Sequence, residues 1–249
     1  MTSGMNRRHF LAALAATSTL GSAASRALAA ASDPMRVQLS WLKTVEFGGM
    51  WLAESRGYFS KSGLSLNWLG GGPNVGAIAP IIAGGQADIG IDQLQQMADA
   101  ASKGTDFVAL AAIFQKSPGG VVSLPANPVH SAKDLLGKRI GVQGNSTKFL
   151  DAILDINGLP HDYTMVPVGF DPTPLVEGAC DVMACFVTNQ PVTLTLQGIE
   201  NIAIPGTDLG LPGYADSIYV TRSFLDANRD RMVDFLEASL RGWTDYLAD

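Results

Sequence analysis

Hydrophobic and polar residues alternate from Met35 to Trp41, so that Val37, Leu39 and Trp41 fall on one face. A period of two is typical of a strand with one buried face. Gly48 to Tyr58 has the apolar spacing of a helix and is followed by predicted strands over residues 64–69 and 87–91 and a helix over 75–83. Strands that alternate with helices predict an α/β fold with a mostly parallel sheet.

The second half of the chain repeats this order, with strands predicted over residues 139–143, 163–168 and 181–186 and helices ending near 157 and 177. Both halves also contain a glycine, then two or three residues, then an aspartate that opens an apolar strand: Gly84 with Asp88, and Gly178 with Asp181. The repeat predicts two lobes, residues 34–120 with 222–249 and residues 121–221. The chain is expected to cross between them near 114–124 and 217–221, which would form a two-segment hinge.

Residues 222–249 carry Phe235, Leu236, Leu240 and Trp243 among other apolar residues at helical spacing. The pattern stops without a glycine or proline. We therefore expect the helical part of the first lobe to be truncated, either in the gene or because the sequence is a fragment.

The N-terminus predicts export. Arg7 and Arg8 precede an apolar run rich in alanine and leucine, and residues 27–29 read Ala-Leu-Ala. These are the three parts of a cleaved signal peptide, here residues 1–29, and the arginine pair is typical of the twin-arginine class. The alternative is an ordinary secretory signal that happens to contain two arginines. Either route predicts a periplasmic protein.

The net charge limits the classes of binding partner that we expect, and the cysteine spacing limits the expected disulfides and metal sites. The full chain carries a net charge of −6, and loss of the three arginines of the signal would leave −9. Such an acidic protein is a poor partner for nucleic acid or anionic lipid. Cys180 and Cys185 flank one predicted strand, which holds them roughly 16 Å apart, too far for a disulfide. We expect both to be small buried residues, and the sequence shows no metal-ligand spacing.

Several motifs resemble a known family. Trp41, Glu46-Phe47-Gly48-Gly49 and Gly57-Tyr58-Phe59 resemble the opening of the SsuA/thiamine-biosynthesis-like family. The segments 84–90 and 134–142 are similar to signatures of the two lobes of periplasmic binding proteins, and residues 186–191 resemble a later Thr-Asn-x-Pro motif. The resemblance implies a periplasmic-binding-protein type II fold. It also implies a monomeric substrate-binding component of an ABC importer, with a permease in the inner membrane as partner.

Ligands of α/β lobes bind beyond the carboxyl ends of strands. Four loops at expected strand ends are therefore candidate ligand contacts: residues 41–49, 70–75, 143–147 and 186–191. Trp41 and Phe47 offer rings for stacking, Glu46 offers a carboxylate, and Asn189 and Gln190 offer both donors and acceptors. Ordinary core, turn and capping roles are the alternatives for these residues. The candidate ligand-binding residues are Trp41, Glu46, Phe47, Gly72, Asn74, Asp92, Gln93, Asn145, Ser146, Thr147, Phe186 and Asn189.

The expected ligand is a small aromatic heterocycle, with a thiamine pyrimidine precursor favoured. Lys43 and Lys148 are the cations in or beside the four loops, which disfavours strongly anionic ligands. Riboflavin, alkanesulfonate and nitrate remain alternatives within the family, and a sensory binding module remains another. A pyrimidine-phosphate synthase is the enzyme alternative. That branch is expected to carry a cysteine-rich C-C-C-F-C motif, where this chain has only Cys185 before Phe186. We therefore expect a binding protein without catalytic residues, metal or cofactor.

Overall fold

The computed structural model describes residues 33–72, 74–144 and 147–248. The predicted signal peptide, together with Asn145 and Ser146, lies outside these residues. The described chain divides into two compact units. The first comprises residues 33–35, 48–67 and 230–248, and the second comprises residues 36–47 and 68–229.

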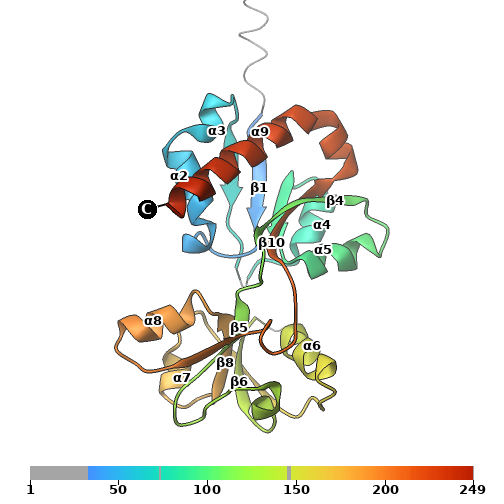
Figure 1. Ribbon diagram of the computed structural model, residues 1–249. Coiled ribbons are helices and arrows are strands. Elements are labelled where there is room, and N and C mark those ends of the chain that lie inside the picture. Colours follow the sequence, from blue (N-terminus) through green and yellow to red (C-terminus); the bar gives the residue numbers. More distant parts are fainter. Residues whose placement is uncertain (1–32, 73, 145–146, 249) are drawn as a thin grey trace, which may run out of the picture. The chain divides into compact units, whose positions relative to one another are not determined.

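The first unit is built on close packing of helices. Helix α2 (Gly48–Ser55) ends just before Gly57, the expected stop, which has φ of 68°, and the short helix α3 (Tyr58–Lys61) follows it. Helix α9 (Arg222–Tyr246), whose second part belongs to this unit, has a non-helical residue at Asn228 (Figure 1). A Cβ at Gly242 of α9 would lie 2.1 Å from the carbonyl oxygen of Gly49, so the two helix backbones are in contact at these glycines.

Aromatic and polar contacts complete this unit. The rings of Phe59 and Phe235 stack with centroids 5.5 Å apart. The Tyr58 hydroxyl donates to Asp245, and the Arg241 guanidinium lies 4.0 Å from the centre of the Tyr58 ring. Helix α9 is thus fixed against α3 at two points along its length.

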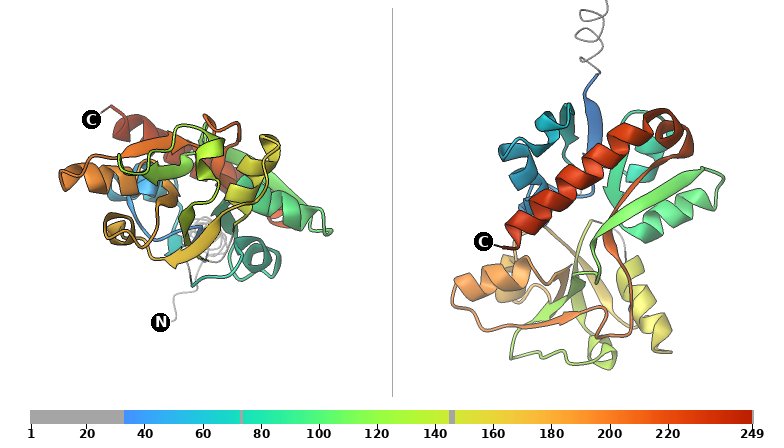
Figure 2. Two further views of the ribbon diagram at one scale, coloured as in Figure 1. Left: turned by 90° about the horizontal axis from the view of Figure 1, so that it is seen from below. Right: turned by 45° about the horizontal axis from the view of Figure 1, so that its top comes forward.

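The second unit contains most of one five-stranded sheet, which we call the first sheet. Its order is β2 (Leu66–Leu69), β1 (Met35–Leu39), β3 (Ile89–Asp92), β10 (Ala215–Thr221) and β4 (Phe107–Phe114). Strands β1 and β3 are parallel, whereas β10 is antiparallel to both β3 and β4. Helices α4 (Ile78–Ala83) and α5 (Leu94–Ala101) pack against β3, β10 and β4 (Figure 1 and Figure 2). A 3-10 turn, η1 (Val45–Phe47), follows β1.

The second sheet also has five strands: β7 (Thr164–Val168), β6 (Arg139–Gln143), β8 (Val182–Phe186), β5 (Gly119–Ser123) and β9 (Ile202–Pro205). Strand β6 is parallel to β7 and β8, and β5 is antiparallel to β8 and β9. Both sheets are therefore mixed and not mostly parallel as expected, because the strands that carry the chain between the sheets run against their neighbours. The remaining elements are η2 (Ala132–Leu135), α6 (Lys148–Ile156), α7 (Thr173–Val176) and α8 (Gln190–Leu196).

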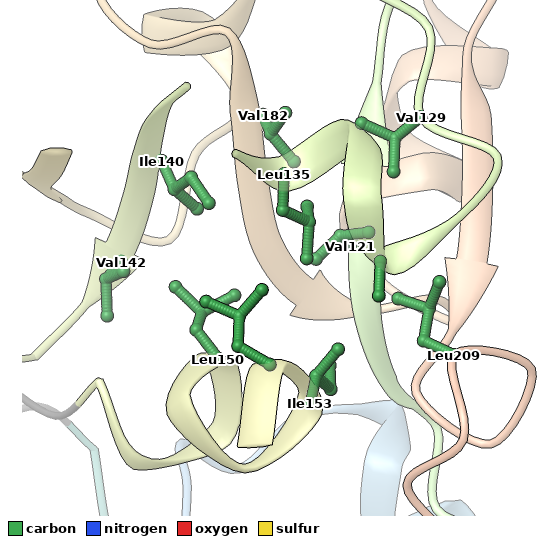
Figure 3. Packing of buried hydrophobic residues seen from close by; sticks show 11 residues of the cluster. Val121, Val129, Leu135, Ile140, Val142, Leu150, Ile153, Val182 and Leu209 are labelled. Atoms are coloured by element: carbon green, nitrogen blue, oxygen red, sulfur yellow. The ribbon is translucent and has the colours of Figure 1, made fainter. Parts of the chain in front are cut away.

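Both faces of the second sheet are covered by apolar residues. Val121 joins a cluster with Leu150 and Ile153, which Figure 3 shows on the side of α6 that faces the strands. Its neighbour Val122 belongs to a different cluster, because successive strand residues point to opposite faces. That second cluster contains Cys180 and Cys185, which are unpaired and buried as expected.

The sequence repeat corresponds to a repeated structural device. Arg36 at the start of β1 donates from its backbone and its guanidinium to Asp88, at 2.8 and 2.7 Å, and also to the Gln86 carbonyl. Arg139 at the start of β6 makes the same bonds to Asp181, at 3.0 and 2.7 Å, and to the Ala179 carbonyl. Such half-exposed ion pairs add little stability, but a shift of one residue in strand pairing would break all these bonds. The sequence echo between the two halves thus corresponds to equivalent hydrogen bonds at equivalent strands of the two sheets.

The connections between the sheets differ partly from expectation. Residues 115–118 join β4 to β5, inside the predicted first crossing. The predicted return crossing at 217–221 is wrong, because these residues form β10 and pair with β3 and β4. The return runs through residues 206–214 instead. The lobe boundaries at 120/121 and 221/222 stay a prediction. None of the described helices is long and apolar enough to cross a membrane.

Candidate functional site

A cavity of about 250 Å³ lies within the second unit, beside the carboxyl ends of strands from both sheets. This is the position at which parallel α/β sheets usually bind ligands. We call it the acid cavity, because two buried carboxyl groups contribute to its wall. Its lining residues are Ser40, Trp41, Glu46, Asp92, Gln93, Gln143, Phe170, Phe186, Asn189 and Gln190.

Three aromatic rings contribute to the wall of the acid cavity. Trp41 follows β1, and its ring centroid lies 6.4 Å from that of Phe170, which follows β7. Phe186 ends β8 and makes an edge-to-face contact with Phe114. Aromatic rings in the wall suit a flat ligand, because stacked and edge-on aromatic contacts add about 0.5–1.5 kcal/mol each beyond the area that they bury.

Two acidic side chains in the wall, Glu46 and Asp92, are almost fully buried. Burial raises the pKa of Asp92 to about 7, although the backbone N–H of Gln93 donates to its carboxylate at 2.7 Å. Burial also raises the pKa of Glu46 to about 9, and the negative charge of the neighbouring Asp216 raises it further. None of the described residues that line this cavity is a lysine or an arginine. The wall is therefore acidic without a basic partner.

Asp216 lies behind the wall and is fully buried in β10, with φ of 49°, in the left-handed region. Its Oδ1 accepts a hydrogen bond from Ser40 at 3.1 Å, whereas its Oδ2 has no donor among the described residues. Because each carboxyl group disfavours ionisation of the other, burial together with this mutual repulsion favours a proton on the Glu46–Asp216 pair. At neutral pH the Glu46–Asp216 pair thus holds a proton, and Glu46 is a neutral carboxyl group, not the carboxylate that the sequence suggested.

Two amide side chains complete the polar wall. Gln190 is almost fully buried, and its Nε2 donates to the Phe170 carbonyl at 3.0 Å while its Oε1 has no donor among the described residues. Leaving a buried acceptor unpaired costs about 1–3 kcal/mol, so a ligand that donates to this oxygen gains affinity. Asn189 begins α8, but its side chain does not cap that helix.

The structure brings together six of the twelve predicted ligand residues: Trp41, Glu46, Asp92, Gln93, Phe186 and Asn189 all line the acid cavity. Ser40, Gln143, Phe170 and Gln190 line it as well. Phe170 was missed, although the end of the strand 163–168 signalled a further loop at the same sheet edge. No sequence pattern marked Ser40.

Four predicted residues lie elsewhere. Phe47 is fully buried and lines neither cavity, so its ring packs in the interior and is not free to stack on a ligand. Gly72 is buried with φ of 126°, and Asn74 is exposed. The glycine loop serves close packing, since a Cβ at Gly71 would lie 2.2 Å from the Leu39 carbonyl oxygen. The Thr147 hydroxyl donates to Asp151 in its own helix at 2.7 Å.

Comparison with solved structures identifies the fold. The periplasmic aliphatic sulphonate binding protein SsuA from Escherichia coli superposes with a TM-score of 0.64 at 18% identity, covering 87% of this chain and 76% of that one. A Candida albicans protein with the generic periplasmic-binding-protein fold superposes with a TM-score of 0.59 at 18% identity, covering 87% and 72%. The protein thus has the type II periplasmic-binding-protein fold, with two five-stranded mixed sheets. The chain belongs to the NMT1/THI5 like family, whose model matches residues 44–249. The resemblance found in the motifs is confirmed.

The curated relatives of this chain carry the names of two different functions, an enzyme activity and ligand binding. The chain is 26% identical over 235 residues to the 4-amino-5-hydroxymethyl-2-methylpyrimidine phosphate synthase THI5 of Saccharomyces cerevisiae, covering 88% of this chain and 68% of the synthase. It is 25% identical over 232 residues to the riboflavin-binding protein RibY of Chloroflexus aurantiacus, covering 85% of this chain and 62% of that protein. The curated relatives of this chain thus include both a protein named as an enzyme and one named as a binding protein.

Proposed function

We propose that the protein is the substrate-binding component of an ABC importer and that it captures a small aromatic heterocycle, with a thiamine pyrimidine precursor favoured and riboflavin as the main alternative. The observation that carries the proposal is the acid cavity, whose wall combines the rings of Trp41, Phe170 and Phe186 with buried carboxyl and amide groups.

The wall of the acid cavity matches the hydrogen-bonding edge of an amino-substituted ring. Asp92 and the unpaired Oε1 of Gln190 accept hydrogen bonds, the protonated Glu46 accepts through its carbonyl oxygen, and Asn189 offers both a donor and an acceptor. A sulfonate or nitrate would place its charge beside these acids without a described lysine or arginine in the wall. Because a buried anion needs a cationic partner, this lining favours the heterocycle over the anionic ligands.

The synthase alternative rests on the named activity of several relatives. Cys185 is the residue of this chain that falls where a cysteine-rich motif would stand. Burial raises the pKa of its thiol far above the usual value, so it is protonated at neutral pH. A protonated thiol is neither a good nucleophile nor a good metal ligand, which favours the binding role.

Trp41→Ala and Asn189→Ala are each expected to weaken heterocycle binding about tenfold or more, which corresponds to about 1.4 kcal/mol. Each substitution removes a group of the acid cavity: a stacking ring, or a donor and acceptor. Titration calorimetry with 4-amino-5-hydroxymethyl-2-methylpyrimidine, riboflavin and taurine measures the effect. Asn74→Ala is the matched control, because Asn74 is exposed and lines neither cavity.

Two results would contradict the proposal. Tight binding of taurine alone would exclude a heterocycle as the ligand. Unchanged heterocycle affinity in both the Trp41 and the Asn189 variants would show that the ligand binds outside the acid cavity.

Export by the twin-arginine route is part of the proposed function, since an importer component meets its ligand outside the cytoplasm. Replacing Arg7 and Arg8 together by lysine is expected to leave the precursor in the cytoplasm, because twin-arginine signals require the arginine pair. Cell fractionation and immunoblotting measure the result, with Arg26→Lys as a control outside the pair. Normal export of the double variant would assign the protein to the general secretory route.

A further inference from the structure

A second and larger cavity adjoins the acid cavity. Its volume is about 380 Å³, and it also lies within the second unit. Gln93, Gln143 and Phe186 line both cavities, so the two spaces are adjacent at these three side chains. We call the larger space the extension cavity.

The wall of the extension cavity differs in chemistry from that of the acid cavity. Apolar side chains form much of it: Val142, Phe149, Ala152, Leu211 and Tyr214. Its charged pair is Lys148 and Asp99, whose Nζ and Oδ2 atoms lie 3.1 Å apart and neutralise each other. Gln95 and Gln96 add neutral amides. This wall suits an uncharged group that has both an apolar surface and hydroxyl or amide groups.

The cavity sizes limit what the acid cavity accommodates alone. Small-molecule sites usually measure roughly 300–1,000 Å³ and enclose most of the ligand. The acid cavity, at about 250 Å³, lies below that range, whereas the two cavities together fall within it. A lone substituted pyrimidine would leave the apolar wall of the larger space without a partner, and the burial of that wall would contribute nothing to affinity.

We propose that the ligand has two parts, a hydrogen-bonding aromatic ring in the acid cavity and an uncharged extension that passes Gln93, Gln143 and Phe186 into the extension cavity. This inference rests on the proposed function and, within its aromatic heterocycles, moves the preference from a single pyrimidine to an extended ligand of the riboflavin type. The ligand is a heterocycle with a second ring or a polar chain attached, closer in size to a flavin than to a single pyrimidine. The extension contacts Phe149 and Ala152 of α6, and its polar groups bond to the glutamine amides.

Matched ligand pairs test the inference by titration calorimetry. Lumiflavin is compared with riboflavin, and 4-amino-5-hydroxymethyl-2-methylpyrimidine with its benzyl ether, so that each pair consists of a ring and the same ring with an uncharged extension. In the pair that binds, the extended member is expected to bind at least tenfold more tightly. Equal affinity of ring and extended ligand would overturn the inference.

Ala152→Leu provides the matching protein variant. Ala152 lines the extension cavity and not the acid cavity, and leucine is a good helix former, so the substitution fills space within α6 without breaking the helix. It is expected to weaken binding of the extended ligand at least tenfold and to leave the bare ring unaffected. Tyr214→Ala, which removes apolar wall from the same cavity at a half-exposed position, is expected to weaken the extended ligand only.

The outcomes separate the two proposals. If neither member of either pair binds the unaltered protein, the proposed function fails. If the heterocycles bind but both variants leave the extended ligand unaffected, or weaken ring and extended ligand equally, the two-part site fails and the proposed function stands. Thermal melting followed by circular dichroism verifies that both variants are folded.

Discussion

Gly242→Ala is expected to lower the free energy of unfolding by about 2–3 kcal/mol, the usual cost of forcing extra atoms into a well-packed contact. A Cβ at this position would lie 2.1 Å from the carbonyl oxygen of Gly49 and 2.6 Å from the Cβ of Ala53. A backbone oxygen inside a helix cannot move aside without shifting α2 against α9. Helix propensity alone predicts the opposite sign, because alanine is favoured over glycine in helices by about 1 kcal/mol. Urea denaturation measures the change in the free energy of unfolding, and its sign shows whether the packing clash or the helix propensity dominates.

Gly169→Ala is the matched control. A Cβ at Gly169 would meet nothing within 4 Å, and its φ lies outside the region that disfavours side chains. We expect a change within about 0.5 kcal/mol, as for most surface substitutions. A Gly242 variant as stable as this control would show that α2 and α9 are not in backbone contact in solution.

The free energy of unfolding is expected to fall by more than about 1.4 kcal/mol as pH rises from about 5 to about 9. This amount corresponds to a pKa shift of one unit. The carboxyl groups of Glu46, Asp92 and Asp216 have pKa values of about 9, 7 and 6 in the folded protein, all raised by burial. They bind protons more tightly when the protein is folded, so their contribution is complete below about pH 4 and is lost as pH rises through these values. Urea denaturation at the two ends of this range measures the loss.

Glu46→Gln is expected to reduce this loss, because glutamine has nearly the same shape and stays neutral at every pH. Asp171→Asn is the matched control: hydrogen bonds from Thr173 lower the pKa of this exposed carboxyl group, so it titrates below the range tested. Stability that rises steadily toward pH 9, or an unchanged pH dependence in the Glu46 variant, would contradict the pKa shifts.

The sequence predicted local elements better than their partners in space. The strand 139–143 was predicted with its observed bounds, because alternation and β propensity are local properties. The paired aspartates Asp88 and Asp181 marked equivalent strands correctly. The residues 217–221 were misplaced because their pattern shows a buried strand but does not show which sheet that strand joins. Sheet membership depends on contacts with residues more than a hundred positions away.

At the candidate site, too, positions that follow from the local pattern were predicted, whereas contacts between distant residues were not. Loop positions after strands located Trp41, Asp92 and Asn189 at one cavity, since the edge at which a strand ends follows from topology. Phe47 was expected to stack on a ligand, yet its neighbours in space bury it completely. The protonated state of Glu46 was also beyond prediction, because it depends on Asp216, which approaches from β10.

The place of β10 imposes an order of assembly on the growing chain. The second sheet uses residues 119–205, a continuous stretch, so all its strands are available as soon as β9 has left the ribosome. Strand β4 of the first sheet is made much earlier but pairs with β10, which ends at Thr221. During synthesis β4 therefore emerges well before its partner β10, and the two strands can pair only after the residues of the second sheet have been made. The first sheet therefore contains the strands that are made earliest, but its last strand is made after all the strands of the second sheet.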